Sequence, residues 1–231
     1  MNSKYKYLLF DADNTLFDFN AAENRAFLAL DSIDPFVFTK ENYPLYHEIN
    51  DLMWKRLEKC EISKSELKSL RFRELYRTLG VDVYDETISM IVATYPKMLA
   101  LGTDLINGAE ELIKNLSRDY EIYIITNGLS DVQTTRLSNS VLKPYIKDLF
   151  ISEAVGAEKP SIRFFDHVLE VIGDSDRSRY IVIGDSLSSD IDGAIASGID
   201  SVYFDPRSVG TKGRSVTYTV RELCEINEIL A

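Results

Sequence analysis

The stretch that decides the fold is Leu8-Leu9-Phe10-Asp11-Ala12-Asp13-Asn14-Thr15-Leu16-Phe17. A short apolar run bounded by turn-forming residues is typical of a buried parallel strand. Asp11 is therefore expected at the carboxyl end of that strand, the edge of an open α/β sheet where ligands bind. Residues i and i+2 of an extended segment lean the same way, so Asp11 and Asp13 are expected to crowd one small site. Such crowding raises the pKa of a carboxyl or invites a divalent cation. Alternatively, the two acids only cap a turn.

Further polar residues follow two apolar runs of the same kind, and a lysine precedes a proline between these runs. In chain order they are Thr126-Asn127-Gly128, Lys159-Pro160, Asp185 and Asp190. The proline is expected to open a helix, because proline is favoured at the first helical position. Each segment taken alone is compatible with an ordinary loop.

Together, and in this order and spacing, these residues and the first stretch match the four sequence motifs of the haloacid dehalogenase-like hydrolases, which the chain strongly resembles. The resemblance covers core segments from both ends of the chain. It implies an α/β fold in which a Rossmann-like parallel sheet forms the catalytic core. It also implies an inserted α-helical cap domain, as in relatives whose cap follows the first strand.

The spacing of the predicted strands indicates that this core is split along the chain. The second long apolar run lies far downstream of the first, and the residues between them have the apolar periodicity of helices. We therefore expect a core of residues 1–17 and 102–231 and a helical cap of residues 18–101. Pro96 is expected to kink or break the last cap helix. Residues 220–230 are expected to form a terminal helix.

The resemblance implies a role for each motif residue. Asp11 is expected to be the nucleophile that forms an aspartyl-phosphate. Asp13 is expected to be the general acid and base, which requires the raised pKa that crowding supplies. Donors and positive charge for the phosphate are expected from Thr126, Asn127 and Lys159, although Asn127 could instead only form a turn.

The same resemblance implies a Mg²⁺ site, because this hard cation prefers oxygen ligands. The ligands are expected to be side-chain carboxylates and one backbone carbonyl, that of Asp13. Asp190 is expected to act through water or by orienting another ligand, unless it only complements a helix N-terminus. The residues expected at the metal are Asp11, Asp13, Asp185 and Asp190.

An acid at position 13 separates the reaction classes of this superfamily. The dehalogenases lack it, because a halide leaving group needs no proton, so Asp13 favours a phosphatase or a phosphomutase. A phosphomutase must shield its aspartyl-phosphate from water, and no such device is visible in the expected cap. Hydrolysis of a phosphomonoester is therefore the favoured reaction.

Several segments resemble bacterial pyrimidine 5′-nucleotidases, among them Phe10-Asp11-Ala12-Asp13 and Gly184-Asp185-Ser186. Asn14 departs from them, since those relatives often have Glu there. A nucleoside monophosphate needs a flat apolar surface for its base and hydrogen-bond partners for its edge. The residues expected to supply these, or else to pack the cap, are Phe17, Asn50, Trp54 and Arg71. A phosphatase for a sugar phosphate or phosphoglycolate would keep the same core residues. A non-catalytic metal- or phosphate-binding protein is the remaining alternative.

Composition restricts the partners. The formal net charge of −11 disfavours nucleic-acid polymers, which require basic surface. No apolar stretch approaches the roughly 20 residues that span a bilayer, and the N-terminal residues lack the pattern of a signal peptide. Only two cysteines are present, Cys60 and Cys224, too few for a disulfide framework. We therefore expect a cytoplasmic protein that acts on a small phosphorylated metabolite.

Overall fold

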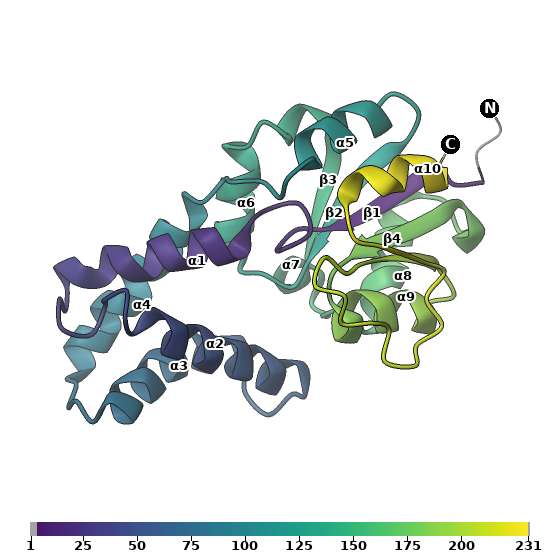
Figure 1. Ribbon diagram of the computed structural model, residues 1–231. Coiled ribbons are helices and arrows are strands. Elements are labelled where there is room, and N and C mark those ends of the chain that lie inside the picture. The colour runs from purple at the N-terminus through teal and green to yellow at the C-terminus, as the bar shows by residue number, and fades with distance from the viewer. Residues whose placement is uncertain (1–3, 231) are drawn as a thin grey trace. The chain divides into compact units, whose positions relative to one another are not determined.

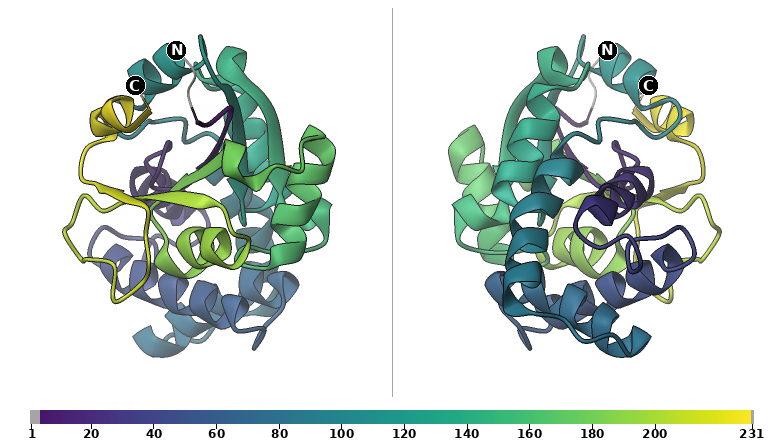
Figure 2. Two further views of the ribbon diagram at one scale, coloured as in Figure 1. Left: turned by 90° about the vertical axis from the view of Figure 1, so that its right-hand side faces the viewer. Right: turned by 90° about the vertical axis from the view of Figure 1, so that its left-hand side faces the viewer.

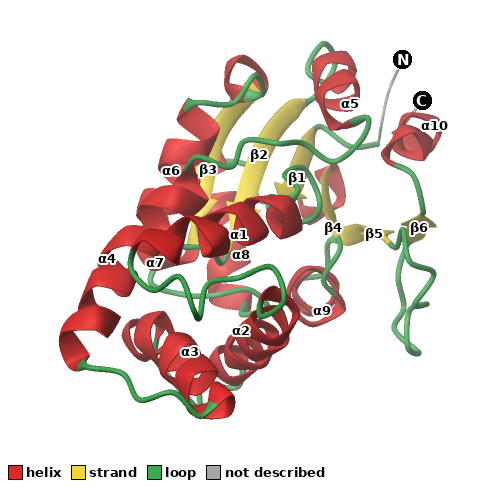
Figure 3. Cartoon of the chain, turned by 60° about the vertical axis from the view of Figure 1, so that its left-hand side comes forward, coloured by secondary structure: helices red, strands yellow, loops and turns green. Residues whose placement is uncertain are grey.

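In residues 4–230, which the computed structural model describes, six parallel strands form one sheet in the order β3-β2-β1-β4-β5-β6 (Figures 1 and 3). They are β1 (Tyr7–Asp11), β2 (Glu121–Thr126), β3 (Ile146–Ile151), β4 (Tyr180–Gly184), β5 (Asp200–Phe204) and β6 (Tyr218–Val220). The predicted α/β fold with a Rossmann-like parallel sheet is confirmed. The strand order reverses between β1 and β4, and ligands of open α/β sheets bind at the carboxyl ends of strands at such a point.

Helices cover both faces of this sheet, which explains why its central strands β1 and β4 are buried along their whole length rather than at alternate residues. Leu8 and Phe10 of β1 pack into a cluster that includes residues of α5 and α10, while Tyr7 and Leu9 pack with α8 and α9. Figure 2 shows α10 beside α5, in agreement with their contacts. The core helices are α5 (Ala109–Leu116), α6 (Ser130–Ser138), α7 (Ser152–Val155), α8 (Ile162–Ile172), α9 (Asp192–Ala196) and α10 (Ile226–Leu230). Short 3₁₀ turns occupy Ala29–Ser32, Lys143–Tyr145, Arg177–Arg179 and Leu223–Glu225.

The chain divides into two compact units, one of Met1–Phe19 with Thr103–Ala231 and one of Asn20–Gly102. The second unit contains four long helices, and its interior is built largely from aromatic rings. Phe27 stacks on Tyr46 with ring centroids 4.8 Å apart, and Phe72 stacks on the same ring at 5.4 Å. The helices are α1 (Phe19–Leu28), α2 (Tyr43–Glu58), α3 (Lys64–Leu79) and α4 (Asp85–Ala100). The role of this unit as a specificity cap stays a prediction.

Three local expectations were wrong. Helix α4 continues through Pro96, so the expected break is wrong, and its buried stripe of Ile91, Tyr95 and Leu99 packs on both sides of the proline; a kink there stays a prediction. Helix α8 begins at Ile162, two residues after Pro160, so the proline does not open it.

The third wrong expectation concerns the C-terminal segment. Val220 pairs with Phe204 and ends a sixth strand, so the expected helix over residues 220–230 is reduced to its last turns. None of the described helices is long and apolar enough to cross a lipid bilayer.

Candidate active site

Asp11 is the last residue of β1 and therefore lies where the strand order reverses. Its carboxylate accepts a hydrogen bond of 2.7 Å from the Lys159 ammonium, and its side chain is 10% exposed. Burial raises the pKa of Asp11 well above its ordinary value; Lys159 acts to lower it, and the nearby carboxylates of Asp190 and Asp185 raise it further. A largely enclosed carboxylate next to one fixed cation suits a nucleophile that reacts with an anionic group.

Lys159 is buried and uses all three of its N–H donors. Besides Asp11, the ammonium donates to the Ile125 carbonyl at 2.9 Å and to Asp190 at 2.6 Å. Burial alone would lower the pKa of Lys159, but the two carboxylates raise it above its usual range. The lysine therefore remains charged and partly neutralises the acids around it. A phosphate contact from Lys159 requires that one of these three bonds be exchanged.

Three carboxylates of the core could hold a metal ion. Asp11, Asp185 and Asp190 each offer an oxygen, and these oxygens lie within 4.8 Å of one another. Burial and the charge of Asp190 raise the pKa of Asp185 to about 7. The Thr15 hydroxyl donates to Asp185 at 3.4 Å and fixes one of its oxygens. Three carboxylates in one cluster fit a hard divalent cation, whose charge would relieve their mutual repulsion.

A glycine makes room for Asp190. A Cβ at Gly184, the last residue of β4, would lie 2.2 Å from Oδ2 of Asp190. The Ser186 N–H donates to that same oxygen at 3.1 Å, at the start of a π-helical turn over Leu187–Ile191. The Gly-Asp-Ser motif thus lets a buried acid approach the strand end. Asp190 is therefore a part of the acid cluster and also accepts from the N–H of Ser186, the residue that caps this helical turn.

The Thr126-Asn127-Gly128 segment begins with the last residue of β2 and contacts Lys159. The Asn127 side chain donates to the Lys159 carbonyl at 2.8 Å and accepts from the Lys159 N–H at 2.9 Å. The Thr126 hydroxyl accepts from the Gly128 N–H at 3.0 Å. Asn127 therefore positions the lysine backbone with its amide. Phosphate binding by the Thr126 hydroxyl stays a prediction.

Asp13 differs from the sequence expectation. Its carboxylate is held by two donors of α6, with Oδ2 accepting from Gln133 at 2.5 Å and Oδ1 paired with Arg136. These contacts come in addition to the expected crowding, since the charge of Asp13 still acts to raise the pKa of Asp11. The sequence did not single out Gln133 or Arg136. The available signal was two polar residues, three positions apart, on the otherwise apolar buried face of one helix.

The four residues expected to contact a nucleoside lie in different environments. Phe17 is buried in the core cluster, with the Arg136 guanidinium 5.6 Å from its ring centroid. Asn50 and Arg71 are buried within the helical unit, where Arg71 donates to Asn50 at 3.1 Å and Asn50 donates to a buried carboxylate, that of Glu23. Trp54 of α2 is half-buried. Of the four, Trp54 alone presents substantial surface in this structure.

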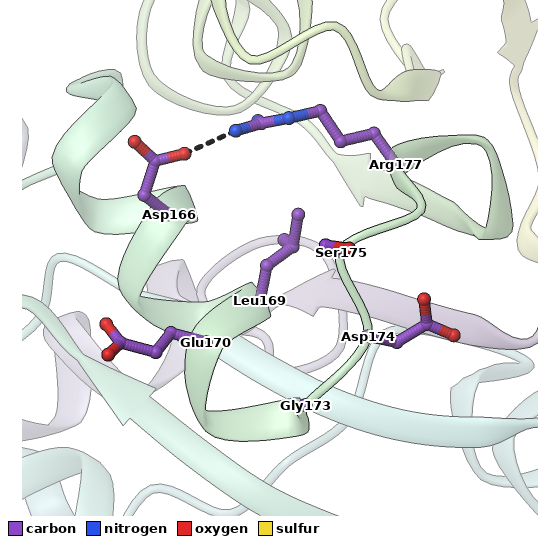
Figure 4. Close-up of a pocket in the computed structure, with 7 residues that line it drawn as sticks. All are labelled: Asp166, Leu169, Glu170, Gly173, Asp174, Ser175 and Arg177. Carbon is purple, nitrogen blue, oxygen red and sulfur yellow. Dashed lines mark hydrogen bonds and ion pairs between the residues drawn. The ribbon is translucent and has the colours of Figure 1, made fainter.

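A cavity of about 380 Å³ lies elsewhere, next to the end of α8 (Figure 4). Its lining includes Asp166 and Arg177, which form an ion pair at 2.5 Å. Arg177 precedes β4, whereas Asp185 follows it. The cavity therefore lies near the amino end of β4, and the acid cluster lies near its carboxyl end. The Asp176-Arg177-Ser178-Arg179 segment forms the 3₁₀ turn before β4. Asp176 caps this turn, and Arg177 also donates to the Ser197 carbonyl.

Comparison with known proteins agrees with this geometry. The family model described as haloacid dehalogenase-like hydrolase matches residues 5–198. The chain is 36% identical to the pyrimidine 5′-nucleotidase PynA of Streptococcus pneumoniae, covering 87% of this chain and 84% of that protein. It is 33% identical to the pyrimidine 5′-nucleotidase YjjG of Escherichia coli, covering 98% of each.

A solved structure is similarly close. The HAD-hydrolase YfnB of Bacillus subtilis, described as bound to magnesium and as showing interdomain movement, superposes with a TM-score of 0.90 at 34% identity, covering 98% of each chain. The protein belongs to the haloacid dehalogenase-like hydrolases. The predicted family, its likeness to pyrimidine 5′-nucleotidases and the prediction of a hydrolase are thereby confirmed.

Proposed function

We propose that the protein is a Mg²⁺-dependent phosphomonoester hydrolase that works through an aspartyl-phosphate on Asp11. One observation carries the proposal: at the strand-order reversal Asp11 contacts the buried ammonium of Lys159, and two further carboxylates lie close by. Phosphoryl transfer requires a positioned nucleophile and positive charge around the phosphoryl oxygens. This cluster supplies the nucleophile and one cation and has the ligands for a second.

The reaction consists of two displacements. In the first, an Asp11 oxygen bonds to phosphorus, the bond to the leaving oxygen breaks, and protonated Asp13 gives its proton to that oxygen. In the second, Asp13 takes a proton from water as the water oxygen bonds to phosphorus and the Asp11–phosphorus bond breaks. Inorganic phosphate leaves, and both carboxyl groups return to their starting states.

The residues fit magnesium. Asp11, Asp185 and Asp190 would hold the ion, the last directly or through water, and the Asp13 carbonyl is a further candidate. When bound, the ion would neutralise and orient phosphoryl oxygens against Asp11. The solved relative described as magnesium-bound supports this choice of metal.

The substrate class we infer is pyrimidine nucleoside 5′-monophosphates. Two relatives at 33–36% identity carry that activity in their names. Trp54, the half-buried aromatic residue of α2, is our candidate for stacking on the base; stacking of a base on an aromatic ring is worth about 1–3 kcal/mol in single-strand binding proteins. Asn50 and Arg71 are buried in the interior of the same helical unit, and we infer that they pack this unit rather than contact the substrate.

A panel of phosphomonoesters tests the proposal. Pyrimidine and purine nucleoside monophosphates, sugar phosphates, phosphoglycolate and p-nitrophenyl phosphate are assayed with Mg²⁺ and with excess chelator. We expect the highest kcat/KM for pyrimidine nucleotides, no turnover in chelator, and no turnover by Asp11→Asn. Asp119→Asn, an exposed acid that precedes β2 at the other edge of the sheet, is the matched control and should behave like the native protein.

Two outcomes would contradict different parts of the proposal. A higher kcat/KM for a sugar phosphate than for any nucleotide would overturn the substrate class and leave the catalytic assignments intact. Absence of turnover on every ester, including p-nitrophenyl phosphate, would overturn the enzymatic function and favour a non-catalytic phosphate-binding protein.

A further inference from the structure

Both oxygens of the Asp13 carboxylate are held by the same helix. Gln133 donates to Oδ2 at 2.5 Å, and Arg136 pairs with Oδ1. Residues three apart on a helix lie on one face, so α6 presents both donors side by side. Neither side chain is displayed to solvent, since Gln133 is 3% exposed and Arg136 is completely buried. A guanidinium this deeply enclosed has little freedom to leave its partner.

The backbone beside these donors is shaped to admit them. A Cβ at Gly128 would lie 2.3 Å from the Gln133 Nε2 atom, closer than any side chain could tolerate. Gly128 thus keeps open the space through which the Gln133 amide reaches Asp13. The Arg136 guanidinium lies over the Phe17 ring at 5.6 Å, and this ring belongs to the loop that carries Asp13. Two independent contacts therefore tie α6 to that loop.

We propose that Gln133 and Arg136 are positioning residues for the proton transfers of Asp13, and that Gly128 is a glycine because Gln133 needs its space. This inference rests on the proposed function, in which Asp13 protonates the leaving oxygen and then deprotonates water. We call Gln133 and Arg136 the α6 clamp.

The clamp is compatible with both proton transfers. A carboxylate offers about four lone-pair sites on its two oxygens, so one protein contact per oxygen leaves a second site on each. The Asp13 side chain is 25% exposed, which gives the leaving oxygen and the attacking water access to those sites. Because Gln133 and Arg136 hold the Asp13 carboxyl group, its remaining lone pairs point in a fixed direction. A fixed direction matters because a proton donor must lie within hydrogen-bond reach of the atom it protonates.

The experiment measures how the rate depends on the leaving group. Phenyl phosphates whose phenols span a range of acidities are hydrolysed with saturating Mg²⁺, and log kcat/KM is plotted against the phenol pKa. A good leaving group departs without a proton, whereas a poor one needs Asp13, so weakening of proton transfer makes the slope steeper. Asp13→Asn gives the slope expected when proton transfer is lost.

We expect Gln133→Met and Arg136→Gln to steepen the slope toward that of Asp13→Asn. Losses should reach about tenfold or more for the poorest leaving group, since a positioned general acid contributes roughly 10²–10⁴-fold. Gly128→Ala should act in the same direction by displacing the Gln133 amide. Thr134→Ala, on the exposed face of the same helix, should leave the slope unchanged. Where Arg136→Gln does not fold, Gln133→Met and Gly128→Ala carry the test.

Combination with Asp13→Asn separates positioning from simple structural damage. If the clamp acts through Asp13, Gln133→Met on the Asp13→Asn background causes no further loss. An equal loss for all leaving groups, or an additional loss on the Asp13→Asn background, would overturn the inference. Native protein that hydrolyses no phenyl phosphate would instead overturn the proposed function.

Discussion

Replacement of Lys159 by methionine tests the charge balance of the buried acid cluster. Methionine keeps much of the length of the side chain but removes the ammonium, which makes three hydrogen bonds, two of them to carboxylates at 2.6 and 2.7 Å. Lys159 is 1% exposed and Asp190 is fully buried, so water cannot compensate the acids that remain. Removal of one partner from a buried ion pair costs about 3–5 kcal/mol, which is our expected loss in the free energy of unfolding.

Urea unfolding at pH 8 in chelator, followed by circular dichroism, measures this loss. Lys114→Met on the exposed face of α5 is the matched control and should change stability by no more than about 0.5 kcal/mol. The double variant Lys159→Met/Asp190→Asn should recover part of the loss, because it removes one of the unpaired charges. Mg²⁺ should narrow the gap between Lys159→Met and the native protein. A loss below about 1 kcal/mol, where 3–5 is expected, or no recovery in the double variant, would refute this account of the cluster.

Three further predictions concern the metal and the helical unit. Gly184→Ala should weaken Mg²⁺ binding in a calorimetric titration, because its Cβ would lie 2.2 Å from an Asp190 carboxylate oxygen; an unchanged affinity would show that Asp190 is not needed by the metal. Apparent Mg²⁺ affinity should fall by about tenfold per pH unit below pH 7, because protons compete for Asp185, whose pKa burial raises to about 7. A raised pKa in the folded state also means that proton binding stabilises the metal-free protein, and that this contribution is lost as pH rises through about 7. Mg²⁺ should therefore raise Tm more at pH 8 than at pH 6, and an equal rise at both would contradict the assignment. Trp54→Ala should lower kcat/KM for a pyrimidine nucleotide far more than for p-nitrophenyl phosphate. Arg71 is buried against Asn50, so Arg71→Ala should lower thermal stability and reduce kcat/KM for both substrates alike. The reverse pattern would make Arg71 the substrate contact.

The elements that define the core were predictable from the sequence, since each central strand is an apolar run that ends in polar motif residues. Residues that end neighbouring parallel strands must meet at one edge, and Asp11 and Asp185 do so next to the strand-order reversal. The insertion of helices after β1 was likewise predictable, because the apolar residues that follow this strand recur at helical spacing. The short strand β6 was not, because three residues of Tyr218–Val220 give too little pattern to distinguish a strand from the start of a helix.

The contacts within the site were less predictable, because they depend on how side chains meet in three dimensions. Phosphate binding by Lys159 stays a prediction, but its bonds to Asp11, Asp190 and a backbone carbonyl were not predicted from the sequence. The roles of Gly128 and Gly184 depend on side chains that occupy the space of a missing Cβ, and no local pattern of glycine reports such a neighbour.

The partners of polar residues in the α6 clamp and in the interior of the helical unit were likewise not predictable from the sequence. Gln133 and Arg136 have polar side chains on a buried helix face, which the sequence marks as unusual without naming their partner. Glu74 lies three residues after Arg71 on the same helix, but Glu74 pairs with Arg77, and Arg71 bonds to Asn50 of α2. Helix packing decides which of several possible partners a charged side chain contacts, and the spacing of residues along one helix does not predict that packing.

The central claim is that Asp11 becomes phosphorylated during turnover, and acid quenching tests it most directly. Asp13→Asn retains the nucleophile but lacks the base for hydrolysis of the intermediate, so p-nitrophenyl phosphate and Mg²⁺ should make the intermediate accumulate. Mass spectrometry of the quenched and digested protein should then find one alkali-labile phosphoryl group on the peptide that contains Asp11, and none after Asp11→Asn is added. Turnover by the native protein with no phosphorylated Asp11 peptide in Asp13→Asn, or with the phosphoryl group on another residue, would contradict the account.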